Sequence, residues 1–294
     1  MKTIKKLTAI LLCLALVLAL AACGSFEQRM VKAAGKMEKL KSYHVDMDMD
    51  LSLALSMMGQ SMDMDMLIKT AMDLRNDPLQ VRSSATLEIM GQSTEMLTYV
   101  FAGEKEGSYE VYASTDGGET WNSSTVDADE LKKELSFDAS ALWSADYLRD
   151  AAKTFEEVGK EEVNGSQATR YDGQIQAEDV GEALANSGVF DTIAESLPVE
   201  VSEILDKFSG SIPVSIWLDD KSGRIVRYDM DMTEAFASVW DTLLAEVLSE
   251  AGGELGDLAE LGVSIELKQL TMSAVLSDFD AVGEIVLPEA AKAA

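Results

Sequence analysis

Methionines and aspartates that alternate along the chain are the residues whose type and spacing could bind a metal ion. Met47, Met49, Met64 and Met66 flank a short break and could face one another, and Cu(I) prefers thioether sulfur. The aspartates between them offer carboxylate oxygens suited to Ca²⁺, but their spacing does not match an EF-hand loop. The same methionines also alternate with Leu, Ile and Val on a face that must be buried. We therefore expect core or pocket lining rather than copper ligands.

Groups that could carry a proton or attack a substrate are scarce in this chain. The single histidine, His44, stands at a helix-to-strand junction, and the two cysteines are Cys13 and Cys23. No serine-hydrolase elbow is recognisable, and nothing singles out the two opposed carboxylates that a glycosidase needs. We expect His44 to cap or pack rather than to catalyse. The sequence therefore predicts a non-enzyme without a cofactor.

The first 23 residues have the layout of a bacterial export signal. Three lysines at positions 2, 5 and 6 precede an apolar stretch, Leu7–Ala19, that is too short to favour a spanning helix. The next four residues, Leu20–Cys23, resemble the lipobox of bacterial lipoproteins. This resemblance implies that residues 1–22 are a signal peptide and that Cys23 is acylated as the first mature residue. The protein is then expected at the cell membrane, lipid-anchored and facing the extracytoplasmic side; an ordinary signal peptide with an incidental cysteine is the alternative.

The mature chain would be strongly acidic and would have no free thiol. Cys13 is lost with the signal and Cys23 would be lipidated, so no disulfide is expected. Removing the three signal lysines leaves 21 Lys and Arg against 52 Asp and Glu, a net charge of −31. This charge argues against a nucleic-acid partner and against electrostatic adhesion to anionic lipid. Because 47% of residues are hydrophobic, a packed fold is still expected.

A long stretch with a period of two, Tyr43–Leu74, organises the predicted fold. Apolar side chains alternate with Asp and Ser on both sides of Met58–Ser61, so each arm is a half-buried strand with one apolar and one wet face. Two such arms around a short Gly-containing break predict a hairpin. A near-copy of this turn, Glu88–Thr94, predicts a second hairpin, and Tyr109–Ala113 a fifth strand. Arms this long must belong to a sheet that curls to cover its apolar face.

Helical and strand patterns alternate in the remainder of the chain. The last strand shifts phase at Lys268–Gln269, which predicts a β-bulge. No linker rich in Pro, Gly and Ser divides the mature chain, so one α+β domain over residues 23–294 is favoured over two domains. The other predicted elements are helices over 27–41, 127–155 and 233–248, strands within 156–176, at 212–218 and 226–232, a final strand over 263–274, and a helical insert at about 177–208.

The segment Ser114–Trp121 matches the Asp-box pattern found in sialidase-type propellers. A propeller would repeat the pattern in each blade, and it occurs once here. Asp116 followed by two glycines suits a tight turn in which the aspartate bonds the nearby backbone and the tryptophan covers the hairpin. We expect a structural turn rather than a catalytic remnant.

Several segments together resemble a known family. A lipobox cysteine and a helix precede a long meander of alternating Met and Asp, and after it come Glu161–Gly165, Thr169–Tyr171, Pro213–Asp219 and Gly223–Val226. This order resembles lipoproteins of the LolA-like class, including the LppX/LprG group and related lipoproteins of Gram-positive bacteria. The resemblance implies an open antiparallel half-barrel wrapped around helices, with a hydrophobic cavity that carries lipids or lipoprotein acyl chains. The long helical middle and the very acidic surface depart from that pattern.

The sequence thus leads to the hypothesis of a non-catalytic lipoprotein that binds a lipid or another hydrophobic ligand, as a candidate lipid carrier. Alternating methionines suit this role because Met is flexible and accepts varied apolar partners. An interaction or sensory module with a filled core is the alternative, and a metal-binding envelope protein is a weaker third. The residues expected to line the cavity are Met47, Met49, Leu51, Leu53, Met64, Met66, Ile68, Leu87, Val214, Ile216 and Met230. The residues expected to face water are Asp46, Asp48, Asp63 and Asp65.

Overall fold

The computed structural model describes most of the chain beyond its N-terminus. The described residues are 26–57, 60–128, 131, 151–178, 181, 208–237, 239–240 and 264–294. The predictions for the signal peptide and Cys23, for most of the helical insert, and for most of the helices expected over 127–155 and 233–248 lie outside these residues.

Eleven strands make up one antiparallel sheet, and helical elements accompany them, including residues 233–237. The elements are α2 (Phe26–Met37), β1 (Ser42–Met57), β2 (Gln60–Asn76), β3 (Leu79–Ile89), β4 (Gln92–Ala102), β5 (Ser108–Ser114), β6 (Asn122–Asp127), the 3₁₀ helix η1 (Ala152–Thr154), β7 (Glu156–Val163), β8 (Ser166–Gln176), β9 (Ser211–Asp219), β10 (Ile225–Asp231), β11 (Ser264–Ser277) and the 3₁₀ helix η2 (Ala291–Ala293). The spatial order is β6-β5-β4-β3-β2-β1-β11-β10-β9-β8-β7.

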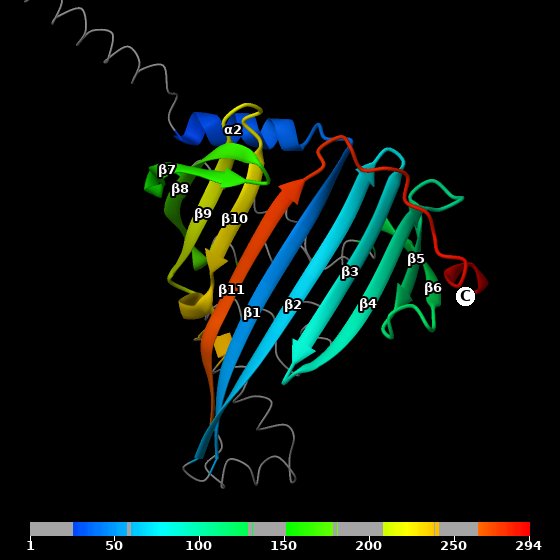
Figure 1. Ribbon diagram of the computed structural model, residues 1–294, viewed down its shortest axis with the longest axis horizontal. Helices are drawn as coiled ribbons and strands as arrows, with labels where there is room; N and C mark the ends of the chain where they lie inside the picture. Colours follow the sequence, from blue (N-terminus) through cyan, green and yellow to red (C-terminus); the bar gives the residue numbers. More distant parts are fainter. Residues whose placement is uncertain are drawn as a thin grey trace, which may run out of the picture.

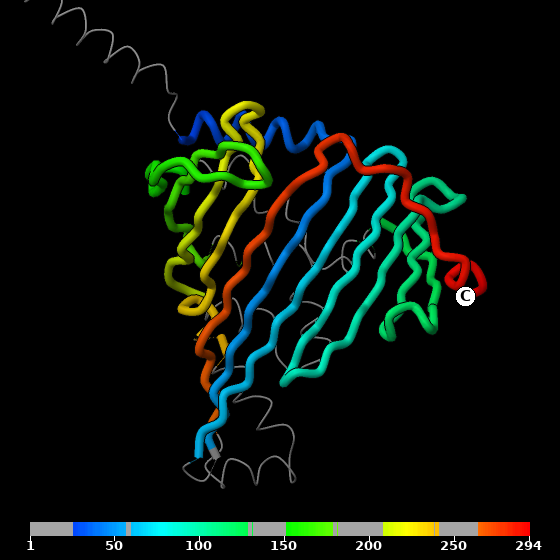
Figure 2. Tube along the Cα trace, viewed as in Figure 1, coloured from blue at the N-terminus to red at the C-terminus, as the bar shows by residue number. Residues whose placement is uncertain are grey.

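The sheet is curved and open. Figure 1 shows β5, β6 and β8, near its two sides, receding behind the central strands β1, β2 and β11. The two edges, β6 and β7, do not pair with each other, so the sheet does not close into a barrel. Figure 2 shows the first and last strands of the chain, β1 and β11, side by side in the middle of the sheet. The predicted α+β class with a curved antiparallel sheet is therefore confirmed, while the predicted internal helices fall largely outside the described residues.

Turn residues set the register of two hairpins. Between β3 and β4, Met90 and Gly91 have φ angles of 50° and 79°, and between β7 and β8, Asn164 and Gly165 have φ angles of 49° and 74°. Two successive positive φ angles define the tight turn whose twist matches that of the flanking strands. The turn within Glu88–Thr94 was predicted from the sequence and is confirmed.

The predicted bulge in the last strand is also confirmed. Ser52 of β1 pairs with Gln269, but the next residue, Leu53, pairs with Leu267, so Lys268 is the extra residue on β11. The extra residue lets apolar side chains on both sides of the bulge point to the same face of the sheet. One strand was missed: β6 contains Val126 as its single apolar residue, so it shows no alternation.

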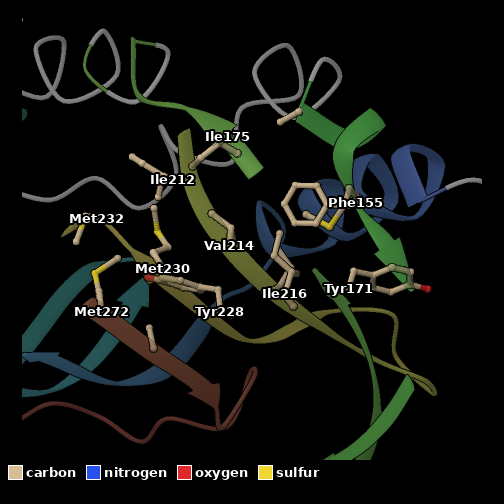
Figure 3. Close-up of a cluster of buried hydrophobic side chains, with 14 of the residues drawn as sticks. Phe155, Tyr171, Ile175, Ile212, Val214, Ile216, Tyr228, Met230, Met232 and Met272 are labelled. Carbon is tan, nitrogen blue, oxygen red and sulfur yellow. The ribbon is translucent and has the colours of Figure 1, made fainter. Parts of the chain in front are cut away.

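The helix α2 packs across one end of the sheet, at the ends of β9 and β10 (Figure 1). Its buried residues recur at helical spacing: Phe26, Met30, Ala33 and Ala34. The Phe26 ring stacks on Phe155 with a centroid distance of 4.6 Å and lies 4.7 Å from the ring of Tyr171. The helix thereby closes one end of the main core, which Figure 3 shows between β8, β9, β10 and β11.

Candidate ligand-binding face

Side chains on one side of the sheet, here called the apolar face, form rows that cross many strands. In the row through Met49 each residue is the register partner of the next, because partners in antiparallel strands point to the same side. From β8 to β4 this row contains Gly173, Val214, Met230, Met272, Met49, Ile68, Leu87 and Thr94. Five of the eleven residues predicted to line a cavity thus lie in one row, although they come from five different strands.

The other six predicted residues lie in parallel rows on the same face. Met47 shares a row with Ala274, Tyr228 and Ile216. Leu51 pairs with Met66, and Leu53 pairs with Met64. All eleven residues therefore face the same side, as the alternation predicted; whether they line a cavity stays a prediction.

Burial along the apolar face changes from strand to strand. Val214, Met230 and Met272 are each 4% exposed and belong to the main core. Farther along the same row, Met49 on β1 and Ile68 on β2 are only half-buried. Along this row the apolar face is therefore filled over β9–β11 and retains accessible apolar surface over β1–β3.

The methionines do not face one another across the β1–β2 hairpin. Met47 pairs with Thr70 and Met49 with Ile68, so the arrangement considered for Cu(I) is wrong for this hairpin. The methionine beside Met49 is instead Met272, from the far end of the chain. Across the described residues, no group of three or more His, Cys, Asp or Glu is placed to hold a metal ion.

The opposite face of the sheet, here called the polar face, is polar over β1 and β2 and carries a separate buried cluster around Trp217. Asp46, Asp48, Asp63 and Asp65 are all exposed, as predicted. His44 lies on this face as the third residue of β1, where it contacts two carboxylates, so it is not a cap at the helix-to-strand junction. That it packs rather than catalyses stays a prediction. The sequence signal that could have shown this is the alternation itself, which places His44 in phase with Asp46.

An arginine–tryptophan–arginine stack on the polar face was missed from the sequence. Trp217 is 2% exposed, and the guanidinium carbons of Arg170 and Arg227 lie 5.1 and 4.7 Å from its ring centroid. The three residues are register partners on β8, β9 and β10, and Trp217 Nε1 donates to Glu161 Oε2 at 2.9 Å. Asp172 accepts from Arg170 and lies close enough that the two charges stabilise each other.

The Asp-box segment forms a structural turn. Asp116 Oδ1 accepts hydrogen bonds from the Ser114 hydroxyl at 2.7 Å and from the backbone N–H of Thr120 at 2.9 Å. Hydrogen bonds lower the pKa of Asp116 to about 2, and those from Thr120 contribute most. Trp121 Nε1 donates to the carbonyl oxygen of Gly118, and its ring lies 5.8 Å from Tyr99. These contacts account for the motif without a substrate.

A single buried donor in the described chain lacks a partner. Nε1 of Trp240 is buried and makes no hydrogen bond, whereas buried donors nearly always have an acceptor. Its sequence neighbour Val239 belongs to the main core. An oxygen-bearing group beside this core would satisfy the donor.

These features define a class of protein: an α+β chain whose single open antiparallel sheet carries an apolar face several strands wide. No helix among the described residues is long and apolar enough to cross a membrane.

Comparison with known proteins gives one family match and several structural ones. Residues 25–134 match the model of a family of unknown function (DUF6612). The chain matches none of the curated proteins with which it was compared. The lipoprotein LppX of Mycobacterium tuberculosis is similar with a TM-score of 0.44 at 11% identity, over 89% of this chain and 98% of that chain. LprF from Mycobacterium bovis gives 0.42 at 15% identity, over 90% of this chain and 97% of that chain. A DUF1329 family protein from Desulfovibrio piger gives 0.23 at 11% identity, over 88% and 93%.

Proposed function

We propose that this protein is a lipid-anchored, non-catalytic lipoprotein that binds the acyl chain of a lipid-like ligand on its apolar face. One observation carries the proposal: the row through Met49 is buried on β9–β11 but half-buried on β1–β3. A domain that needed this face only as a core would bury the row throughout. The half-buried side chains continue the row beside the packed core. An apolar ligand that covered them would bury the rest of the row.

The accessible part of the row suits a segment of an acyl chain. From Met49 on β1 to Leu87 on β3 it crosses three strands, and neighbouring strands lie roughly 4.8 Å apart, so it spans about 10 Å. Each CH₂ group taken from water would contribute about 0.8 kcal/mol. Met49 and Met66 would adapt to such a chain because thioether side chains are flexible.

The anchor would keep this face close to a membrane. Only two residues separate Cys23 from α2, which begins at Phe26. An acylated Cys23 would thus hold the domain within a short distance of the lipid surface, where a ligand could be collected or delivered. Cells fed with radiolabelled palmitate are expected to label the wild-type protein but not a Cys23→Ala variant.

Native mass spectrometry of the chain without residues 1–23 tests the binding proposal. We expect the protein to carry co-purified lipid, released on activation in the gas phase. Clean apoprotein that also fails to take up added fatty acid would overturn lipid binding and favour an interaction module with a filled core. A metal adduct in place of lipid would favour the metal-binding alternative.

A further inference from the structure

The helix α2 has an outer face that differs in charge from the rest of the protein. Residues 26–41 contain five basic and two acidic residues, a net charge of +3, whereas the remainder of the chain from Cys23 onward carries −34. The net charge of the whole chain argues against adhesion to anionic lipid, but this segment carries the opposite charge. The helix that follows the predicted anchor is thus the basic part of an acidic molecule.

The exposed side of α2 has the composition of a membrane-facing helix. Val31 is 45% exposed, and Lys32 and Lys36 of α2 are exposed as well. In the turn after α2, Lys39 and the acidic Glu38 are also exposed. Lys36 donates to the carbonyl oxygen of Ser222, while Lys32 and Lys39 form no ion pair within the described part of the chain. An amphipathic helix with basic residues and an exposed apolar residue on its outer side is typical of a helix that lies on a lipid surface.

The opposite side of α2 is fixed to the protein and is therefore not available for this contact. Met30 and Ala33 are fully buried, and Arg29 donates to the Tyr171 hydroxyl. Because the helix cannot rotate, its orientation sets the orientation of the sheet. In Figure 1 the strands run away from α2, and the turn at Met90, which is 67% exposed, lies at the far end of β3 and β4.

We infer that the outer face of α2 docks on an anionic phospholipid surface and holds the domain with its strands pointing away from the membrane. This inference rests on the proposed acylation of Cys23. Because only two residues separate Cys23 from α2, an acylated Cys23 keeps α2 close to that surface. The attraction between its lysines and anionic lipid turns the exposed side of α2 toward the membrane. The acidic remainder is repelled over about one Debye length, roughly 8 Å at physiological ionic strength, which favours the same orientation. Each lysine held near an anionic surface shifts the docking equilibrium about fivefold.

A single-thiol label tests the docking on the intact lipoprotein. When Cys13 is removed and Cys23 is acylated, a Val31→Cys variant has one free thiol, which is labelled with a nitrobenzoxadiazole fluorophore. The protein is reconstituted into phosphatidylcholine vesicles, with or without phosphatidylglycerol, that contain a nitroxide quencher on the lipid headgroup. We expect quenching that increases with phosphatidylglycerol and falls with salt. A Met90→Cys variant with the same label, at the far end of the sheet, should remain unquenched.

Matched charge variants separate docking from simple tethering. In the Val31→Cys background, Lys32→Gln should lower the docking equilibrium about fivefold, whereas Lys268→Gln, on β11, should not change it. Equal quenching at both label positions, or quenching at position 31 that ignores phosphatidylglycerol, would overturn the docking. Mass spectrometry of the N-terminal peptide reports acylation separately. A protein without the acyl group would overturn both the anchor and the docking. An acylated protein whose label at position 31 is unquenched would overturn the docking alone.

Discussion

Nδ1 of His44 lies 2.7 Å from Oδ1 of Asp73, its register partner on β2. On the other side of the ring, Nε2 lies 3.2 Å from Oδ1 of Asp46. Burial of the imidazole opposes its charge, but the hydrogen bonds to Asp73 and Asp46 outweigh burial and raise the pKa of His44 above its usual value of 6.5. The polar face therefore contains a histidine that the folded state prefers to keep charged.

The His44 contacts should stabilise the fold mainly at acidic pH. A pKa that is higher in the folded than in the unfolded state gives stabilisation that is complete below the unfolded value and is lost as pH rises through the folded value. Asp73→Asn should therefore cost about 0.2–1 kcal/mol at about pH 6 and less at about pH 9. Because His44 is the single histidine, its NMR resonance gives the pKa directly. An unchanged His44 pKa in Asp73→Asn, with Asp48→Asn as the control, would contradict this account.

A glycine in β8 makes room for an aromatic ring. A Cβ atom at Gly173 would overlap the ring of Phe155, which is held in place by its stack on Phe26. Gly173→Ala should therefore destabilise the protein by about 1–3 kcal/mol, the usual cost of overpacking. The matched control is Gly159→Ala in β7, where an added Cβ meets nothing within 4 Å and should change stability by less than about 0.5 kcal/mol. Urea denaturation of both variants measures the difference; equal stabilities would rule out the steric explanation.

The stack on the polar face should show measurable coupling between Trp217 and its arginines. Arg227 lies over the ring and also donates to Asp229 at 2.7 Å, so Arg227→Ala removes both contacts. In a double-mutant cycle with Trp217→Leu, we expect a coupling free energy of about 0.5–1 kcal/mol. The reason is that part of the stability that Arg227 provides comes from its contact with the Trp217 ring. The same cycle with Arg224, which lies 5.2 Å from Phe279 instead, should give no coupling to Trp217.

Alternation along single strands predicted which side chains share a face, and turn residues predicted where strands reverse. The shift of phase at Lys268 was enough to place a bulge. What could not be predicted were contacts between strands that are distant in sequence, because register there depends on the whole sheet. Met49 meets Met272, and Arg170 meets Trp217, only because β11 inserts beside β1 and β9 beside β8. The strand β6 was missed because its edge position leaves it almost without apolar residues.

Met49 and Met272 are direct register partners on β1 and β11, but their surroundings differ. Met272 is 4% exposed within the main core, while Met49 is half-buried at the side of that core. The same substitution at these two positions therefore distinguishes a packed core from accessible surface.

Replacing each of the two methionines with tryptophan tests the ligand-binding face most directly. Met272→Trp should strain the core and lower the free energy of unfolding by about 1–3 kcal/mol. Met49→Trp should instead occupy the accessible apolar surface, so that the melting temperature holds while uptake of a fluorescent fatty acid falls. Asp48→Asn, next to Met49 but on the polar face, should leave both properties unchanged, since exposed substitutions usually cost less than about 0.5 kcal/mol. A Met49→Trp protein that melts well below wild type and still binds the fatty acid normally would place Met49 in a packed core and refute a binding face over β1–β3.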